Sequence, residues 1–131
     1  MKILLVEDNA ADALLVEEAF EEAQFECAIT VVRDGEQAVA FFDALDADPS
    51  HDCPDLILLD LNLPKVSGTT VLERLRASPR CAETKVLIVS SSDAPGDRQK
   101  AMTLGASDYF RKPSSLKEFM LLGAKVKSML A

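Results

Sequence analysis

The sequence lacks the features that mark secreted and membrane-spanning proteins. Its cysteines are few, odd in number and without CxxC spacing: Cys27, Cys53 and Cys81. Met1 and Lys2 lead directly into a short apolar run followed by acidic residues, which is not the pattern of a signal peptide. No apolar stretch approaches the roughly 20 residues that a transmembrane helix needs. We therefore expect a protein of the reducing cytoplasm that does not bind to membranes.

Positive charge is also scarce. The chain has 14 Lys and Arg residues against 22 Asp and Glu residues, which gives a formal net charge of −8. Nucleic acids and anionic lipids are bound by clustered basic residues, so the composition argues against both as partners. Small cations and basic protein surfaces suit this composition better.

The length and hydrophobic content fit one domain. A chain of 131 residues lies within the typical domain size of about 100 to 200 residues, and 48% hydrophobic residues provide enough apolar surface for a core. We predict a single domain over residues 1–131. Because the last helical pattern reaches Leu130, we expect no output domain after it.

Short apolar runs alternate with longer segments of helical periodicity along the whole chain. The runs are nearly continuously apolar, which is typical of strands covered on both faces. They predict five strands, at residues 3–6, 28–32, 56–59, 86–89 and 109–110. A helical segment follows each run, and the last of the five helices is expected over residues 115–130. This order predicts an α/β fold, a doubly wound five-stranded parallel sheet with five helices on its two faces.

Residues 46–54 are rich in acidic residues and contain two prolines, which predicts an extended surface loop. His51 and Cys53 lie two residues apart in this loop. Without a second ligand pair they do not predict a metal site, and we expect both to be solvated. We expect Cys27 and Cys81 to pack as small apolar residues or to lie near the surface.

Polar side chains stand at the carboxyl ends of four predicted strands, where ligands bind in open α/β sheets: Glu7, Asp8, Asp60, Ser90 and Lys112. Each acid alone is explained equally well as a helix cap or a solvated turn. As a set, the three carboxylates predict a bound cation, because each close pair repels by about 4 kcal/mol at an effective dielectric constant of about 20. Mg²⁺ fits, since it prefers oxygen ligands. An acyl phosphate formed on Asp60 would also be contacted by Lys112 and Ser90.

These residues and their neighbours resemble the receiver domain of two-component response regulators over nearly the whole chain. The segments that carry the resemblance are Leu4-Leu5-Val6-Glu7-Asp8-Asn9, Asp34-Gly35-Glu36-Gln37-Ala38, residues 55–64, Ser67-Gly68, Val89-Ser90 and Tyr109-Phe110-Arg111-Lys112-Pro113. The resemblance implies a flavodoxin-like sheet of strand order 2-1-3-4-5. It also implies that a histidine kinase transfers a phosphoryl group to Asp60.

The resemblance also implies a role for each residue of the site. Mg²⁺ would be bound by Glu7, Asp8, Asp60 and the backbone carbonyl of Asn62. Lys112 and Ser90 would contact the phosphoryl group, and Ser90 and Tyr109 would form the switch. Many receivers have threonine at the position of Ser90. Both residues carry the hydroxyl, and within the run Ser90-Ser91-Ser92 the alternation of strand faces favours Ser90.

A receiver of this kind is a signalling protein that catalyses its own aspartyl phosphorylation and dephosphorylation, not an enzyme that acts on other substrates. The long 46–54 loop, the segment 61–65 and the expected absence of an output domain are similar to the single-domain regulators associated with phytochromes. This similarity implies a phytochrome as the histidine kinase. Met120, Leu121 and Leu122 spread apolar surface beyond one helix face, which predicts a homodimer through the fourth strand, fifth strand and last helix.

Two other functions fit parts of the pattern. Haloacid-dehalogenase enzymes also use a strand-end aspartate and Mg²⁺. Their nucleophile follows the first strand, and a second aspartate stands two residues later, where this chain has Asn62. A flavin-binding or protein-binding module of the same fold would not need Glu7, Asp8, Asp60 and Lys112 together. The sequence therefore favours a phosphorylation switch.

Overall fold

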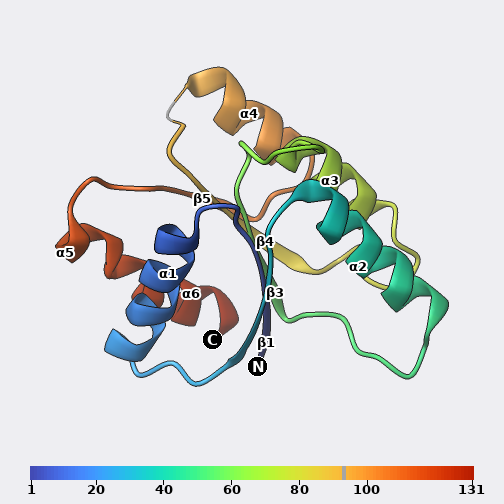
Figure 1. Cartoon of the computed structure of the whole chain (residues 1–131), viewed down its shortest axis with the longest axis horizontal. Coiled ribbons are helices and arrows are strands. Elements are labelled where there is room, and N and C mark those ends of the chain that lie inside the picture. Colours follow the sequence, from blue (N-terminus) through green and yellow to red (C-terminus); the bar gives the residue numbers. More distant parts are fainter. Residues whose placement is uncertain (93) are drawn as a thin grey trace.

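The computed structural model is one parallel sheet with helices on both faces (Figure 1), and it describes residues 1–92 and 94–131. The strands are β1 (Lys2–Val6), β2 (Ala28–Val32), β3 (Leu56–Leu59), β4 (Lys85–Ser90) and β5 (Asp108–Arg111). The helices are α1 (Ala10–Glu22), α2 (Gly35–Ala47), α3 (Gly68–Arg76), α4 (Pro95–Thr103), α5 (Leu116–Phe119) and α6 (Leu121–Leu130). The strand order is β2-β1-β3-β4-β5, which confirms the predicted topology.

Alternating residues of each central strand feed two separate cores. In β1, Leu4 and Val6 pack in the core under α2, α3 and α4, whereas Ile3 and Leu5 pack in the core under α1, α5 and α6 (Figure 1). This arrangement follows from the period of two residues in a strand, and it explains why the strand sequences are apolar at every position. The polar residues that follow the strands are therefore confined to the edges of the sheet.

Side chains cap most of the helices at their amino ends. The side chains of Asn9, Asp34, Ser67 and Ser115 each accept a hydrogen bond from a backbone N–H of the first turn. Helix α4 has no such cap, and it begins with Pro95. The longest helices, α1 and α2, have 13 residues each. Within the described residues, no helix has both the length and the apolar character to cross a membrane.

Two element boundaries differ from the prediction. The expected loop over 46–54 is wrong at its start, because α2 continues to Ala47. Asp46 is held on this helix by an ion pair with Arg74 (2.7 Å) and by a hydrogen bond from the Ser78 hydroxyl (2.6 Å). The helix expected over 115–130 divides at Met120 into α5 and α6.

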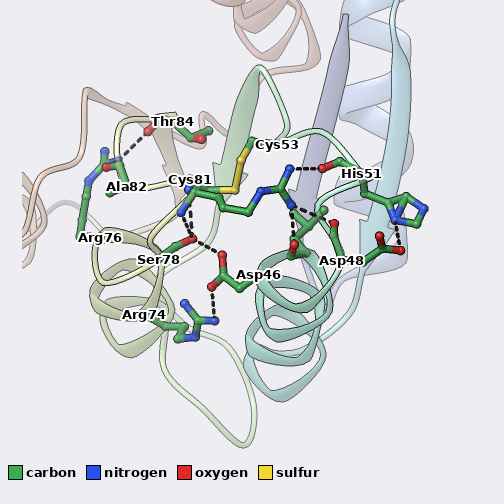
Figure 2. The surroundings of a disulfide bond; sticks show 12 residues. Asp46, Asp48, His51, Cys53, Arg74, Arg76, Ser78, Cys81, Ala82 and Thr84 are labelled. Atoms are coloured by element: carbon green, nitrogen blue, oxygen red, sulfur yellow. Dashed lines mark hydrogen bonds and ion pairs between the residues drawn. A yellow bond between two sulfur atoms is a disulfide. The ribbon is translucent and has the colours of Figure 1, made fainter.

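A disulfide bond joins Cys53 to Cys81 (Figure 2). Cys53 precedes β3 and Cys81 precedes β4, and these strands are neighbours, so the topology brings the two residues to a Cα–Cα distance of 5.7 Å. The prediction that Cys53 is a solvated thiol is therefore wrong. Because two of the three cysteines are bonded to each other, the cysteine content no longer indicates a reducing compartment. Cys81 is buried as expected, and Cys27 is a free cysteine.

Arginine side chains form hydrogen bonds between the segments around the disulfide, for example Arg74 with Asp46 and Arg76 with the Thr84 carbonyl (Figure 2). The Arg80 guanidinium donates hydrogen bonds to the carbonyls of Leu45, Asp48 and His51, on the segment that leads to Cys53. His51 itself is exposed, as predicted, and forms an ion pair with Asp48 at 3.0 Å. The disulfide and Arg80 therefore fix the α2–β3 loop against the α3–β4 connection.

Candidate functional site

The predicted site residues come together at the carboxyl edge of the sheet. Glu7 follows β1, Asp60 follows β3, Ser90 ends β4 and Lys112 follows β5. Backbone hydrogen bonds continue just past the strand ends, from Glu7 N–H to the Val32 carbonyl (3.0 Å), from Asp60 N–H to Val6 (3.2 Å) and from Lys112 N–H to Ser90 (2.8 Å). The functional side chains therefore project from backbone that is held like the strands themselves.

Lys112 is the centre of the charge cluster. Its ammonium Nζ lies 2.5 Å from Glu7 Oε1, 2.8 Å from Asp12 Oδ2 and 2.9 Å from Asp60 Oδ2. The side chains of Glu7, Asp60 and Lys112 are at most 10% exposed. Asp8 lies beside Glu7 and Asp60, so the site holds four carboxylates and one ammonium and is strongly acidic even with Lys112 in place.

Burial raises the pKa of Glu7 to about 7, although the hydrogen bond and charge of Lys112 act to lower it. For Lys112, burial alone would lower the pKa, but hydrogen bonds to Asp12, Glu7 and Asp60 more than offset this effect and raise it. One ammonium cannot neutralise several carboxylates. Glu7, which is buried, therefore keeps its proton to a higher pH than an exposed glutamate does. A divalent cation would remove this imbalance.

The first prediction concerns the pH dependence of stability without metal. The folded-state pKa of Glu7 is raised from 4.5 to about 7, so the folded state holds this proton more tightly than the unfolded state. The contribution of Glu7 to the free energy of unfolding should therefore fall as pH rises from about 4.5 to 7, by up to about 3 kcal/mol. Urea unfolding at pH 5 and pH 7.5 in EDTA should show this loss in the wild type and a smaller one in Glu7→Gln.

Added Mg²⁺ provides the control for this prediction. If the cation binds the acidic cluster, the wild type at pH 7.5 should gain about 2.7 kcal/mol at a hundredfold excess over its dissociation constant. Glu7→Gln, which removes one ligand charge, should gain less. Equal pH profiles of the two proteins in EDTA would contradict the assignment of the raised pKa to Glu7.

The donor set at the edge fits a hard divalent cation. Glu7, Asp8 and Asp60 each offer a carboxylate oxygen, and these oxygens lie within 4.8 Å of one another. Mg²⁺ and Mn²⁺ prefer such oxygen ligands, and Mg²⁺ retains several waters beside one or two carboxylates. The backbone N–H of Asn62 donates to Asp60 Oδ1 at 3.0 Å. The predicted role of the Asn62 carbonyl as a ligand stays a prediction.

Gly68 allows α3 to begin directly against the backbone of Asp60. A Cβ atom at this position would lie 2.3 Å from the Asp60 carbonyl oxygen and 2.6 Å from Leu61 Cα, distances that real side chains do not show. The Gly68 N–H donates to the Leu61 carbonyl at 3.0 Å. Only glycine fits this contact, which explains the Ser67-Gly68 pair in the sequence.

Ser90 and Tyr109 lie on the neighbouring strands β4 and β5. Ser90 is fully buried and ends β4. Because both faces of β4 are buried, the role of Ser90 as the switch hydroxyl within the serine run stays a prediction. Its Oγ accepts a hydrogen bond from Ser92 N–H at 3.3 Å. The Tyr109 ring is 5% exposed, and its hydroxyl donates to the Ser92 carbonyl at 2.6 Å. Ser92 therefore contacts both residues of the predicted switch.

Asp12 is the site residue that the sequence reasoning missed. It lies in the first turn of α1, four residues after Asp8, and its carboxylate reaches Lys112 across 100 positions of sequence. Strand-end patterns do not identify it, because it is on a helix. The signal available in the sequence was an acidic residue in the helical turn that directly follows the Glu7-Asp8 pair.

The fold and this edge define a class of α/β domain, a flavodoxin-like sheet with an acidic, cation-compatible site around a buried aspartate. Within that class, the model of the response regulator receiver domain matches residues 3–122. The chain therefore belongs to the receiver domain family of response regulators, whose members typically switch by phosphorylation. The match agrees with the resemblance seen in the sequence motifs.

Two relatives by sequence cover most of the chain. Response regulator Rcp1 of Synechocystis sp. is 32% identical over 126 residues, which is 96% of this chain and 86% of that protein. Probable methanogenesis regulatory protein FilR2 of Methanothrix harundinacea is 34% identical over 125 residues, or 95% of this chain and 80% of that protein. The similarity to both extends over nearly all of the sheet and its helices.

Solved structures give the same result. The Mn²⁺-bound form of Rcp1 aligns with a TM-score of 0.85 and 32% identity, over 97% of this chain and 91% of that one. The phosphorylated cyanobacterial phytochrome response regulator RcpA aligns with a TM-score of 0.87 and 32% identity, over 98% and 92% of the two chains. The architecture described above is thus shared with response regulators.

Proposed function

We propose that this chain is a phosphorylation switch in which Asp60 accepts the phosphoryl group. The observation that carries the proposal is the position of the Asp60 carboxylate: it is buried, it lies 2.9 Å from the Lys112 ammonium, and two further acids stand beside it. In the transfer, an Asp60 oxygen forms a bond to phosphorus while the bond from phosphorus to the donor breaks. The product is an acyl phosphate on this chain, so the chemistry is confined to its own side chain.

Each residue of the cluster has a role in this step. Glu7, Asp8, Asp60 and the backbone carbonyl of Asn62 would hold Mg²⁺. When bound, the ion supplies positive charge to the cluster and to the phosphoryl oxygens. Lys112 donates hydrogen bonds to the phosphoryl group from the other side. The fixed backbone under Asp60 keeps its carboxylate at the same place before and after transfer.

The signal would leave the site through Ser90, Ser92 and Tyr109. A phosphoryl oxygen offers the Ser90 hydroxyl a strong acceptor, which draws this side chain toward Asp60. Ser92 is bonded to Ser90 Oγ through its N–H and to the Tyr109 hydroxyl through its carbonyl. Movement of Ser90 would therefore be transmitted to the tyrosine through one intervening residue.

The proposed phosphoryl donor is a histidine kinase of the phytochrome type. Support comes from the similarity to RcpA, described as a cyanobacterial phytochrome response regulator, and to Rcp1. The net charge of −8 makes nucleic acid an unsuitable partner, so the output would be a contact with another protein.

Mass spectrometry of the intact chain tests the proposal. Incubation with acetyl phosphate and Mg²⁺ should add one phosphoryl group, and EDTA should prevent the addition. The adduct should be lost in hydroxylamine, which cleaves acyl phosphates. A chain that gains no phosphoryl group from acetyl phosphate or from a histidine kinase would contradict the proposed function.

A homodimer through β4, β5 and the α5–α6 segment is the proposed output contact. Leu116 is 58% exposed and Leu121 is 62% exposed on this segment, whereas Leu122 is fully buried. Burial of the exposed leucines in a partner would remove apolar surface from water. Sedimentation at tens of micromolar should show a dimer in the presence of beryllofluoride, and Leu121→Glu should weaken its association at least tenfold.

Substitution of a polar residue on the same segment gives the matched control. Lys117 is exposed beside Leu116, and Lys117→Ala should leave the association within about twofold. Two further lysines of this segment form contacts within the chain, Lys125 with Asp108 (2.8 Å) and Lys127 with the Ala23 carbonyl (2.9 Å). A monomer under all conditions would exclude the dimer and leave a different protein as the partner.

A further inference from the structure

Asp12 contacts Lys112 from outside the cation cluster. Its Oδ2 lies 2.8 Å from Lys112 Nζ, and its side chain is 26% exposed, compared with 10% for Lys112. The backbone N–H of Asp12 donates to the Asn9 side chain at 3.1 Å, which fixes the first turn of α1. The carboxylate therefore approaches the ammonium from a rigid helix start, on the solvent side of the site.

The three carboxylates on Lys112 are not equivalent. Glu7 and Asp60 belong to the group whose oxygens can converge on a cation, whereas Asp12 does not. Glu7 and Asp60 would help to hold a cation in that group, and its positive charge would repel the ammonium. Phosphorylation would then bond one carboxylate oxygen of Asp60 to phosphorus, as an acyl phosphate. Of the three carboxylates, Asp12 alone would neither bind the cation nor carry the phosphoryl group, so it could still pair with Lys112.

If the contacts with Glu7 and Asp60 were lost, Asp12 would be the remaining ion-pair partner of the Lys112 side chain among the described residues. The backbone N–H of Lys112 donates to the Ser90 carbonyl, but the side chain has four rotatable bonds. Lys112 and Asp12 both line an open hollow of about 650 Å³, together with Ser91 and Glu118. Without Asp12, the ammonium could turn into this hollow and become hydrated there.

We propose that Asp12 is the positioning residue for Lys112, and that it keeps the ammonium beside Asp60 once a cation and a phosphoryl group engage the other two carboxylates. The inference rests on the proposed function and adds a residue to its machinery. Asp12 acts through Lys112 and does not touch the transferred group. Misplacement of a group that contacts the transition state costs up to about a hundredfold in rate, so a partial loss of position should be measurable.

The test compares Asp12→Ala with Asp12→Asn. The asparagine oxygen still accepts a hydrogen bond from Lys112, whereas alanine cannot. Asp12→Ala should slow phosphorylation by acetyl phosphate about tenfold with the Mg²⁺ dissociation constant within twofold of the wild type, and Asp12→Asn should restore the rate to within about threefold. Glu118→Ala is the matched control, because Glu118 lines the same hollow without an ion pair to Lys112 among the contacts described, and its rate should be unchanged.

Three results would overturn the proposal: a wild-type rate in Asp12→Ala, equal slowing in the alanine and asparagine variants, or slowing that follows weakened Mg²⁺ binding. A direct measurement separates this proposal from the proposed function. The ¹⁵N signal of the Lys112 ammonium in the Mg²⁺-loaded protein should be visible in the wild type and in Asp12→Asn and lost in Asp12→Ala. If the wild type takes up no phosphoryl group, the proposed function fails, and this signal still decides whether Asp12 holds Lys112.

Discussion

Asp60→Asn should take up no phosphoryl group under conditions in which the wild type is fully labelled. The substitution preserves the shape of the side chain and an oxygen that can accept hydrogen bonds from Lys112 and Asn62. It removes the carboxylate nucleophile, because an amide oxygen does not form a stable acyl phosphate. We expect a loss of at least a thousandfold in labelling rate, measured by intact mass after incubation with acetyl phosphate and Mg²⁺.

Asp55→Asn is the matched control for this variant. Asp55 precedes β3, whereas Asp60 follows it, so the two aspartates stand at opposite ends of the same strand. Asp55 is exposed and accepts a hydrogen bond from the Lys2 backbone at 2.7 Å. Its substitution should leave labelling unchanged. Persistent labelling of Asp60→Asn at the wild-type rate would move the acceptor to another acid, with Asp8 the first to examine.

The disulfide should contribute strongly to stability and little to phosphorylation. Cys53 and Cys81 are separated by 28 residues, and closing a loop of this length stabilises a fold by about 3 to 4 kcal/mol in the chain-entropy model. The double variant Cys53→Ala/Cys81→Ala should lose about this amount in urea unfolding. Its labelling rate should stay within twofold, because the disulfide precedes β3 and β4 whereas the site follows them.

Reduction of the wild type should give the same loss without any substitution. Dithiothreitol should lower the free energy of unfolding of the wild type and leave the double variant unchanged. Cys27→Ala removes the free thiol and should change stability by less than about 1 kcal/mol. A reductant effect of equal size in the double variant, or none in the wild type, would show that the bond does not stabilise the protein in solution.

Most of the fold could be predicted because the apolar runs in the sequence match the burial of the strands on both faces of the sheet. Residues such as Leu4 and Leu5 are apolar in succession within a short run, which is typical of a strand covered on both faces, and the two cores use alternate residues of the strand. The end of α2 could not be predicted in this way. Asp46 is an acidic residue before a proline-containing loop, and its place on the helix depends on Arg74 and Ser78, which are distant in sequence.

The site was predictable to the extent that it is built from strand ends. Glu7, Asp60 and Lys112 each follow an apolar run, so a parallel sheet places them at one edge. Asp12 and the disulfide depend on packing between elements, which periodicity does not report. The Cys53–Cys81 pair was nevertheless accessible from topology, since each cysteine lies three or four residues before one of two adjacent strands.

The weak packing of helix α4 affects how this domain would respond to phosphorylation. Ala101 is its one buried residue, whereas α3 buries Val71, Leu72 and Leu75. Stabilisation by burial scales with apolar area at roughly 25 cal/mol per Å², so moving α4 along the sheet sacrifices little free energy. Arg98 of this helix lies over the Tyr109 ring at 5.4 Å, so a movement of the ring would alter a contact of this helix. We expect the unphosphorylated domain to sample several α4 positions, and phosphorylation to narrow that existing distribution instead of creating a new arrangement.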